Sequence, residues 1–126
     1  MATQSEAVSR IGEFIKWEED ARFSREVFVI KSGAVLVDGE LCHADTGEKD
    51  ALAIADAAAA DSIYTGPDIT GDGTKTGVFI VRDAVVSKQR LNYGALSGTE
   101  ATADAALKAL GILVRSEPAK QTTQTT

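Results

Sequence analysis

The chain has 126 residues, of which 44% are hydrophobic and 25% are charged, and its formal net charge is −6. This length allows one ordinary domain and is too short for two well-cored domains. The acidic balance disfavours nucleic acid and anionic membranes as partners, and the longest apolar runs are too short to cross a bilayer. Cys42 is the single cysteine, so the chain cannot form an internal disulfide. These totals predict a soluble one-domain protein made in a reducing cytosol.

The two ends of the sequence differ from its middle. Residues 116–126, SEPAKQTTQTT, contain almost nothing that could anchor a core, so we predict a disordered polar tail there. Near the other end, large apolar residues stand among polar ones at Ile11, Phe14, Ile15 and Trp17, and an acidic run follows. Their spacing fits a helix and fits an extended arm equally well, because the window is too short to decide.

The middle of the chain is dominated by strand signals. Residues 27–30 and 34–37 are apolar runs rich in β-branched side chains, and an Asp-Gly pair at 38–39 predicts a tight turn before a further run at 41–43. Residues 77–81 predict another strand, with 84–86 as its continuation or its partner. The alanine-rich stretch 51–60 fits either a short helix or a strand of small residues.

One helix is indicated late in the sequence. Ser97 and Glu100 have the spacing of a capping box, and Gly111 stands where the helix should end. The residues expected on its buried face are Ala103, Ala106, Leu107 and Leu110. Residues 112–114 then predict a short closing strand. The pattern as a whole predicts a mainly β (α+β) domain with one helix in its C-terminal half.

No constellation of residues predicts catalysis or metal binding. His43 is the only histidine and follows Cys42 directly, so in a strand the two side chains would face opposite ways. Residues 68–73 resemble the start of a calcium-binding loop, but the twelfth position is Phe79 where a bidentate glutamate should stand. A solvated turn is the better interpretation. We therefore predict no catalytic residues, no cofactor and no metal site.

Three stretches of the sequence resemble the phage lambda-type head decoration protein family. They are residues 23–29 (FSREVFV), residues 33–41 (GAVLVDGEL) and residues 106–115 (ALKALGILVR). Their order also fits, because an acidic arm containing Trp17 precedes a β-rich body and an alanine-leucine helix that ends in Leu-Gly-Ile. The resemblance covers about residues 11–115.

The resemblance implies a structural protein and not an enzyme. It implies a compact, barrel-like (β-tulip) domain over residues 23–115, and homotrimers at three-fold and quasi-three-fold positions on the outside of the expanded head. There the protein would cement subunits of the major capsid protein against the pressure of packaged DNA. It would be made in the host bacterial cytoplasm and end on the outer surface of the virion.

The resemblance also implies a flexible N-terminal arm, residues 1–22, that orders on contact with the capsid. The contact residues are then expected to be Ile11, Phe14, Ile15, Trp17, Phe23, Ser24 and Arg25. The alternative for this segment is that it folds back as a first helix or strand of the domain. Two other functions stay open: a free-standing β-domain that binds protein or carbohydrate through Trp17, Tyr64 and Tyr93, and, less favoured, a small accessory enzyme using Cys42 and His43.

Overall fold

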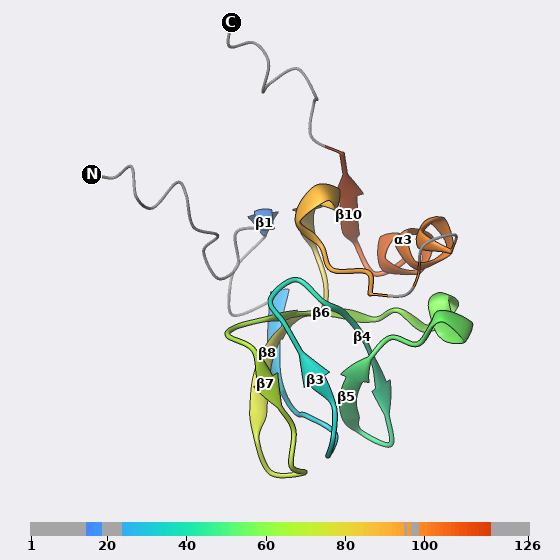
Figure 1. The fold of residues 1–126 in the computed structure, drawn as a ribbon. Coiled ribbons are helices and arrows are strands. Elements are labelled where there is room, and N and C mark those ends of the chain that lie inside the picture. Colours follow the sequence, from blue (N-terminus) through green and yellow to red (C-terminus); the bar gives the residue numbers. More distant parts are fainter. Residues whose placement is uncertain (1–14, 19–23, 95, 97–98, 117–126) are drawn as a thin grey trace, which may run out of the picture.

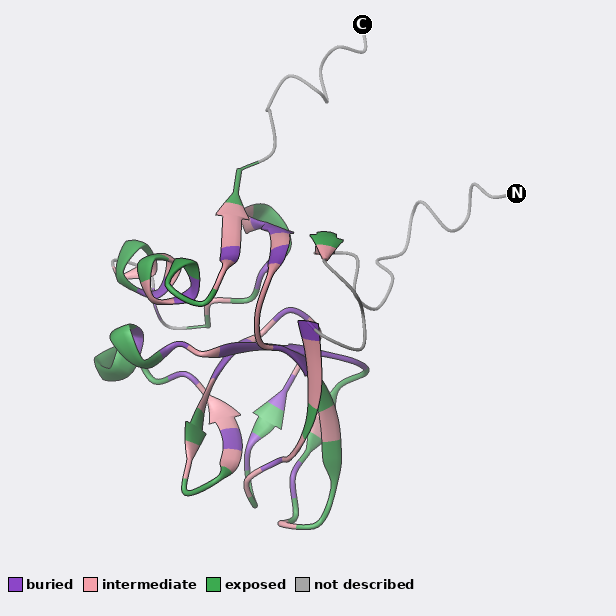
Figure 2. Cartoon of the chain, turned by 180° about the vertical axis from the view of Figure 1, so that it is seen from behind, coloured by how far each residue is buried: buried purple, intermediate pink, exposed green. Residues whose placement is uncertain are grey.

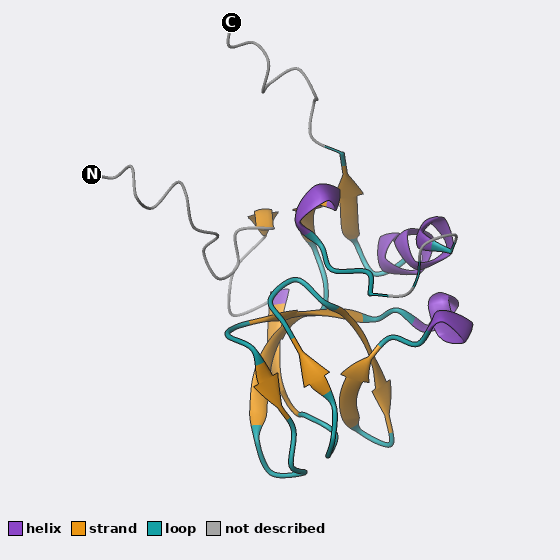
Figure 3. Ribbon diagram, in the orientation of Figure 1, coloured by secondary structure: helices purple, strands orange, loops and turns teal. Residues whose placement is uncertain are grey.

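A computed structural model describes residues 15–18, 24–94, 96 and 99–116 of the chain (Figure 1; Figure 3). Strands predominate, so the mainly β prediction is confirmed, and α3 (Glu100–Lys108) is the α-helix of the C-terminal half. The described residues also contain two short 3-10 helices, η1 (Ile54–Ala59) and η2 (Lys88–Arg90). The strands are β1 (Ile15–Glu18), β2 (Arg25–Val29), β3 (Val35–Leu36), β4 (Leu41–Asp45), β5 (Glu48–Ala51), β6 (Ser62–Thr65), β7 (Ile69–Thr70), β8 (Thr76–Ile80), β9 (Ala84–Ser87) and β10 (Ile112–Arg115).

The largest sheet has five antiparallel strands in the order β2-β8-β6-β4-β5. It curls until its edges meet at one point, where Ile30 forms a bridge with Lys49 and the Lys31 N–H donates to the Lys49 carbonyl at 2.9 Å. A two-stranded sheet of β3 and β7 lies beside it. This curled sheet is the barrel-like part of the domain. The described strands as a whole form three separate sheets and close no barrel.

A three-stranded sheet, β1-β9-β10, occupies the end of the molecule that also carries α3 (Figure 1). Strand β10 runs parallel to β9, and parallel neighbours need a long crossover connection, which α3 supplies here. The prediction that residues 84–86 continue or pair with the preceding strand is wrong. Asp83 has a φ of 46° and turns the chain, so that β9 leaves β8 and enters the other sheet.

Two short segments that connect strands can be compared with what the sequence predicts for them. The turn at Asp38 and Gly39 forms as predicted, and Gly39 has a φ of 84° that suits glycine. It joins β3 to β4, which lie in different sheets, so it is not a hairpin turn. The alanine-rich stretch contains the 3-10 helix η1, which packs against α3.

Helix α3 begins later than the sequence indicates. Its N-cap is Thr99, whose side chain does not cap the helix and instead donates to the Leu96 carbonyl at 3.2 Å. The predicted capping box is wrong, because Glu100 is the first helical residue; Ser97 lies outside the described residues. The helix buries Ala103 and Leu107 and half-buries Ala106, whereas Leu110 follows the helix and is 39% exposed. The helix ends at Lys108, and Gly111, the predicted stop, follows three residues later with a φ of 85°.

Two apolar clusters hold the domain together, and Figure 2 shows where the buried residues fall along the strands and helices. One cluster lies within the five-stranded sheet and its β3-β7 cover, and consists of Ile30, Ala34, Leu36, Cys42, Tyr64 and Phe79. The other joins the five-stranded sheet to the three-stranded sheet and α3, and consists of Leu41, Leu52, Ala57, Ala60, Ile63, Ile80, Ala84, Val86, Leu91, Leu96, Ala103, Leu107 and Ile112. The three-stranded sheet is therefore fixed to the rest by a shared core.

Candidate functional site

Four of the seven residues expected in the capsid-binding arm can be placed. Ile15 and Trp17 lie in β1, Ser24 directly precedes β2, and Arg25 opens it. The other three, Ile11, Phe14 and Phe23, lie outside the described residues. Residues 15–18, which the sequence assigned to a flexible arm, form an edge strand antiparallel to β9. For residues 15–18 the structure therefore has the alternative arrangement, in which the segment folds back as a strand of the domain.

An irregularity in β1 gives Ile15 and Trp17 opposite environments. Ile15 pairs with Val86 and Trp17 pairs with the next residue of β9, Val85, so Lys16 is an extra residue in the register. Such a bulge reverses the usual alternation, because residues two apart otherwise point the same way. Ile15 consequently packs on the shared core, whereas Trp17 is 51% exposed.

Ser24 and Arg25 both have partners within the domain. Ser24 is fully buried, and its hydroxyl donates to the Asp83 carbonyl at 3.0 Å. The Arg25 guanidinium donates two hydrogen bonds to the Glu18 carboxylate, at 3.0 and 2.8 Å, and so ties β2 to β1. Paired bonds of this type fix orientation as well as charge. These contacts position β1, and nothing in the local sequence signals them.

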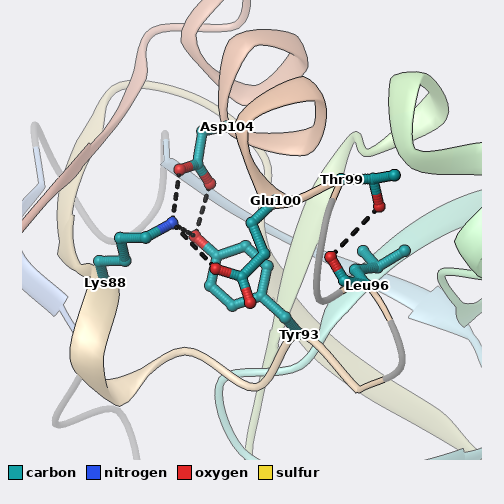
Figure 4. A network of polar contacts seen from close by, with 6 residues as sticks. All are labelled: Lys88, Tyr93, Leu96, Thr99, Glu100 and Asp104. Carbon is teal, nitrogen blue, oxygen red and sulfur yellow. Dashed lines mark hydrogen bonds and ion pairs between the residues drawn. The ribbon is translucent and has the colours of Figure 1, made fainter.

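A polar network beside β9 holds η2 against α3 (Figure 4). Lys88 contacts the Asp104 carboxylate at 2.9 Å and the Glu100 carboxylate at 3.4 Å, and its ammonium lies 4.5 Å from the Tyr93 ring centroid. The Tyr93 hydroxyl donates to Asp104. Burial and then this hydrogen bond raise the pKa of Tyr93. Burial lowers the pKa of Lys88, but Asp104 and Glu100 outweigh it, so the net shift is upward.

We call this network the clamp, because its ion pairs and hydrogen bonds tie η2 to α3. A proton-transfer catalyst works best with a pKa near the operating pH, and both pKa shifts move Lys88 and Tyr93 away from neutrality. Sequence reasoning missed the clamp, because its members are up to 16 residues apart and only the crossover through α3 brings them together.

Cys42 and His43 do not form a nucleophile–base pair. Cys42 is fully buried among apolar side chains, and burial raises the pKa of its thiol well above the usual range. His43 is the next residue of β4 and is half-buried on the other side of the strand. A buried, protonated thiol is a poor nucleophile, so this geometry does not favour the accessory-enzyme alternative.

The aromatic side chains do not gather into a binding platform. Tyr64 is 2% exposed and its hydroxyl donates to the Pro67 carbonyl at 2.7 Å. Tyr93 is engaged in the clamp, which leaves Trp17 as the exposed member of the three. A carbohydrate-binding surface of stacked aromatics is therefore not assembled from these residues.

Within residues 68–73, the Asp72 carboxylate accepts hydrogen bonds from residues that follow it closely in the chain. Asp72 Oδ1 accepts from the Thr74 N–H at 2.8 Å, the Thr74 hydroxyl at 2.7 Å and the Lys75 N–H at 3.0 Å, an arrangement that fixes a turn. Among the described residues, no group of three or more His, Cys, Asp or Glu side chains is placed to hold a metal ion. No helix in the described part of the chain is long and apolar enough to span a membrane.

Taken together, the described residues define a small β protein whose candidate site is an edge strand with an exposed tryptophan. The sequence profile described as bacteriophage lambda head decoration protein D matches residues 4–114. The chain belongs to this family, and it is a structural component of the phage head. Curated protein sequences give no match.

Proposed function

We propose that the chain binds the outer surface of the expanded phage head as homotrimers at three-fold and quasi-three-fold positions. There it cements subunits of the major capsid protein against the pressure of packaged DNA. The observation that carries this proposal is the family match, which spans the domain and most of the segment before β1. In this proposal the protein acts by binding alone, so its affinity for the head has to come from side-chain and backbone contacts at its surface.

Strand β1 and the residues before it supply the contact in this proposal. Within the described sheets β1 is an edge strand, paired with β9 on one side only. An extended capsid segment can add to its other edge, gaining main-chain hydrogen bonds and pockets for alternate side chains. In this form of the proposal β1 stays on the domain, and Ile11, Phe14 and Trp17 make contacts while Ile15, Ser24 and Arg25 hold the strand in place.

Trimerisation turns weak contacts into durable ones. Ordering a peptide segment costs conformational entropy, which limits the affinity of a single copy. Once one copy of a trimer has bound, the effective concentration of the other two at their sites is high. If the capsid sites have the matching separation only after expansion, the full multivalent free energy is available only on the mature head.

The first test is the number of copies per particle. Purified expanded heads should contain this chain and the major capsid protein in a ratio near one to one, and unexpanded shells should lack it. Quantitative gel densitometry or mass spectrometry of both particle types measures the ratio. A few copies per head, or equal occupancy of unexpanded shells, would rule out cementing as stated.

A truncation pair tests the N-terminal segment. Deleting residues 1–14 keeps β1 and its contact with the shared core, so the domain should fold and lose capsid affinity. Deleting residues 117–126 removes a polar segment of similar length and should leave binding unchanged. Equal binding by both truncated proteins would remove the segment before β1 from the proposal.

A further inference from the structure

The three-stranded sheet presents an apolar row on the side turned away from the core. Trp17 pairs with Val85, and Val85 pairs with Leu113, so the three side chains share one face across β1, β9 and β10. Trp17 is 51% exposed, and Val85 and Leu113 are half-buried. We call these three residues the outer row. The bulge at Lys16 creates it, because regular alternation would put Trp17 on the same side as Ile15.

The outer row continues into a groove along the free edge of β10. The groove has a volume of about 450 Å³ and lies between β10 and α3. Leu113 belongs to both features, and the other lining residues are Ala101, Asp104, Ala105, Lys108, Val114 and Arg115. Among the described strands β10 lies at the edge of its sheet, and its side chains Leu113 and Val114 add apolar surface to the groove. Exposed apolar surface of this kind marks contact sites in soluble proteins.

Within the part of the chain that the structure describes, charge distinguishes this end from the rest. Residues 24–82, which we call the acidic body, contain ten Asp or Glu and five Lys or Arg, a net charge of −5. Residues 15–18 and 83–116 contain four acidic and five basic residues, a net charge of +1. Around the outer row and groove the exposed charged residues include Lys16, Lys108 and Arg115. A partner with carboxylates around an apolar centre would be complementary to this rim.

We propose that the outer row and its groove form a second docking surface for the major capsid protein, which contacts it with an apolar patch bordered by acidic residues. This inference rests on the proposed cementing function and adds to it a side-chain surface distinct from the strand edge of β1. The occupant follows from continuity, because the proposed capsid-binding segment joins the domain at β1, which also carries Trp17. The acidic body then lies on the side away from the capsid.

The test compares point substitutions in the full-length chain. Trp17→Thr and Val85→Thr remove apolar contact from the outer row, and Val27→Thr is the matched control, because Val27 is a 64% exposed strand valine in the acidic body. Each protein is titrated onto expanded heads that lack the decoration protein, and bound copies are counted after sedimentation. Circular dichroism and thermal unfolding check that each variant is folded.

We expect Trp17→Thr to weaken binding by at least about tenfold, the usual range for a tryptophan anchor. Val85→Thr should weaken it by about threefold, since a smaller group leaves the contact, and Val27→Thr should bind as the unchanged chain does. Arg115→Glu should weaken binding most at low salt, since rim charges are screened. Full binding by both row variants would overturn the docking surface while leaving cementing intact; failure of the unchanged chain to bind would overturn both.

A second copy of this chain is the competing occupant, and the free protein distinguishes it. Trp17 is the only tryptophan, so its fluorescence reports on the outer row alone. We expect acrylamide to quench it equally at low and high protein concentration, and Trp17→Thr to leave the native mass unchanged. Protection that grows with concentration, together with a lower mass for Trp17→Thr, would assign the row to a contact between copies and overturn the proposal.

Discussion

The acidic body and the three-stranded sheet are held together in different ways. The acidic body encloses a cluster of its own, in which Phe79 contacts the rings of Phe28 and Tyr64 at centroid distances of 6.0 and 5.4 Å. Among the described residues the three-stranded sheet forms no cluster of its own, and its inner side is buried in the shared core. The difference indicates that the acidic body provides stability, whereas the sheet depends on it and offers its outer side for contact.

The largest effects should come from emptying each cluster. Phe79→Ala removes the central ring of the acidic body, and Leu107→Ala removes a fully buried side chain of α3 from the shared core. We expect Phe79→Ala to lower the free energy of unfolding by about 3–5 kcal/mol and Leu107→Ala to lower it by about 2–5 kcal/mol. Both should shift one cooperative transition, measured by urea unfolding with two spectroscopic probes. A separate early transition in Leu107→Ala would show that the two regions unfold independently.

The next largest effect concerns a buried cation at the point where β5 approaches β2. The Lys49 side chain is 4% exposed, lies 4.4 Å from the Phe28 ring centroid and pairs with Asp61 at 2.8 Å. Asp61→Asn leaves this ammonium buried without its counter-charge and should cost about 2–3 kcal/mol. Lys49→Met keeps the apolar stem and leaves only the more exposed carboxylate, so it should cost less. Denaturant titration of both variants measures their free energies of unfolding. Equal losses for Asp61→Asn and Lys49→Met would contradict this prediction.

A smaller effect is expected where β1 is tied to β2. Arg25→Ala removes both hydrogen bonds to Glu18, and because the pair is partly exposed we expect a loss of about 0.5–1 kcal/mol. Capsid binding should fall more than stability does, since the strand loses its fixed position. Arg82→Ala, which removes a second surface pair with Glu26, is the control and should leave binding unchanged. If Arg25→Ala and Arg82→Ala lowered capsid binding equally, the tie between β1 and β2 would not be needed for binding.

The smallest effect is a pH dependence within the acidic body. Burial raises the pKa of Glu40 above its ordinary value of 4.5, despite the hydrogen bond that its carboxylate accepts from the Val37 N–H. A raised folded-state pKa contributes stability below 4.5 that is lost as the pH rises through the folded value. Glu40→Gln should therefore be slightly more stable than the unchanged chain at neutral pH and lose this advantage in acid. Thermal unfolding across pH tests this, and an advantage that grows in acid would contradict it.

Local features of the fold could be predicted from the sequence. The strand signals at 27–30, 41–43, 77–81 and 112–114 are all met by strands, and Gly111 follows the end of the helix at Lys108 with a positive φ. Short-range chemistry decides these features: β-branched runs favour extended backbone, and glycine accepts the positive φ after a helix. The resemblance to the decoration family came from the same local stretches, and the family match supports it.

Pairing between distant segments could not be predicted in this way. The separation of β9 from β8 depends on the turn at Asp83 and on a parallel partner almost thirty residues later. The opposite environments of Ile15 and Trp17 depend on a bulge that no local pattern signals. The clamp of Lys88, Tyr93 and Asp104 likewise exists only after the crossover has formed.

The bulge at Lys16 also limits how sequences of this kind can change length. Residues can be inserted or lost before Ile15 without altering which side of the sheet the later ones occupy. Within β1, removal of one residue would restore regular alternation and exchange the inward and outward positions. The indole would then be directed at the shared core, or the aliphatic side chain at solvent. The pairing of β1 with β9 therefore fixes the spacing from Ile15 to Trp17, and it sets no such limit on the number of residues before Ile15.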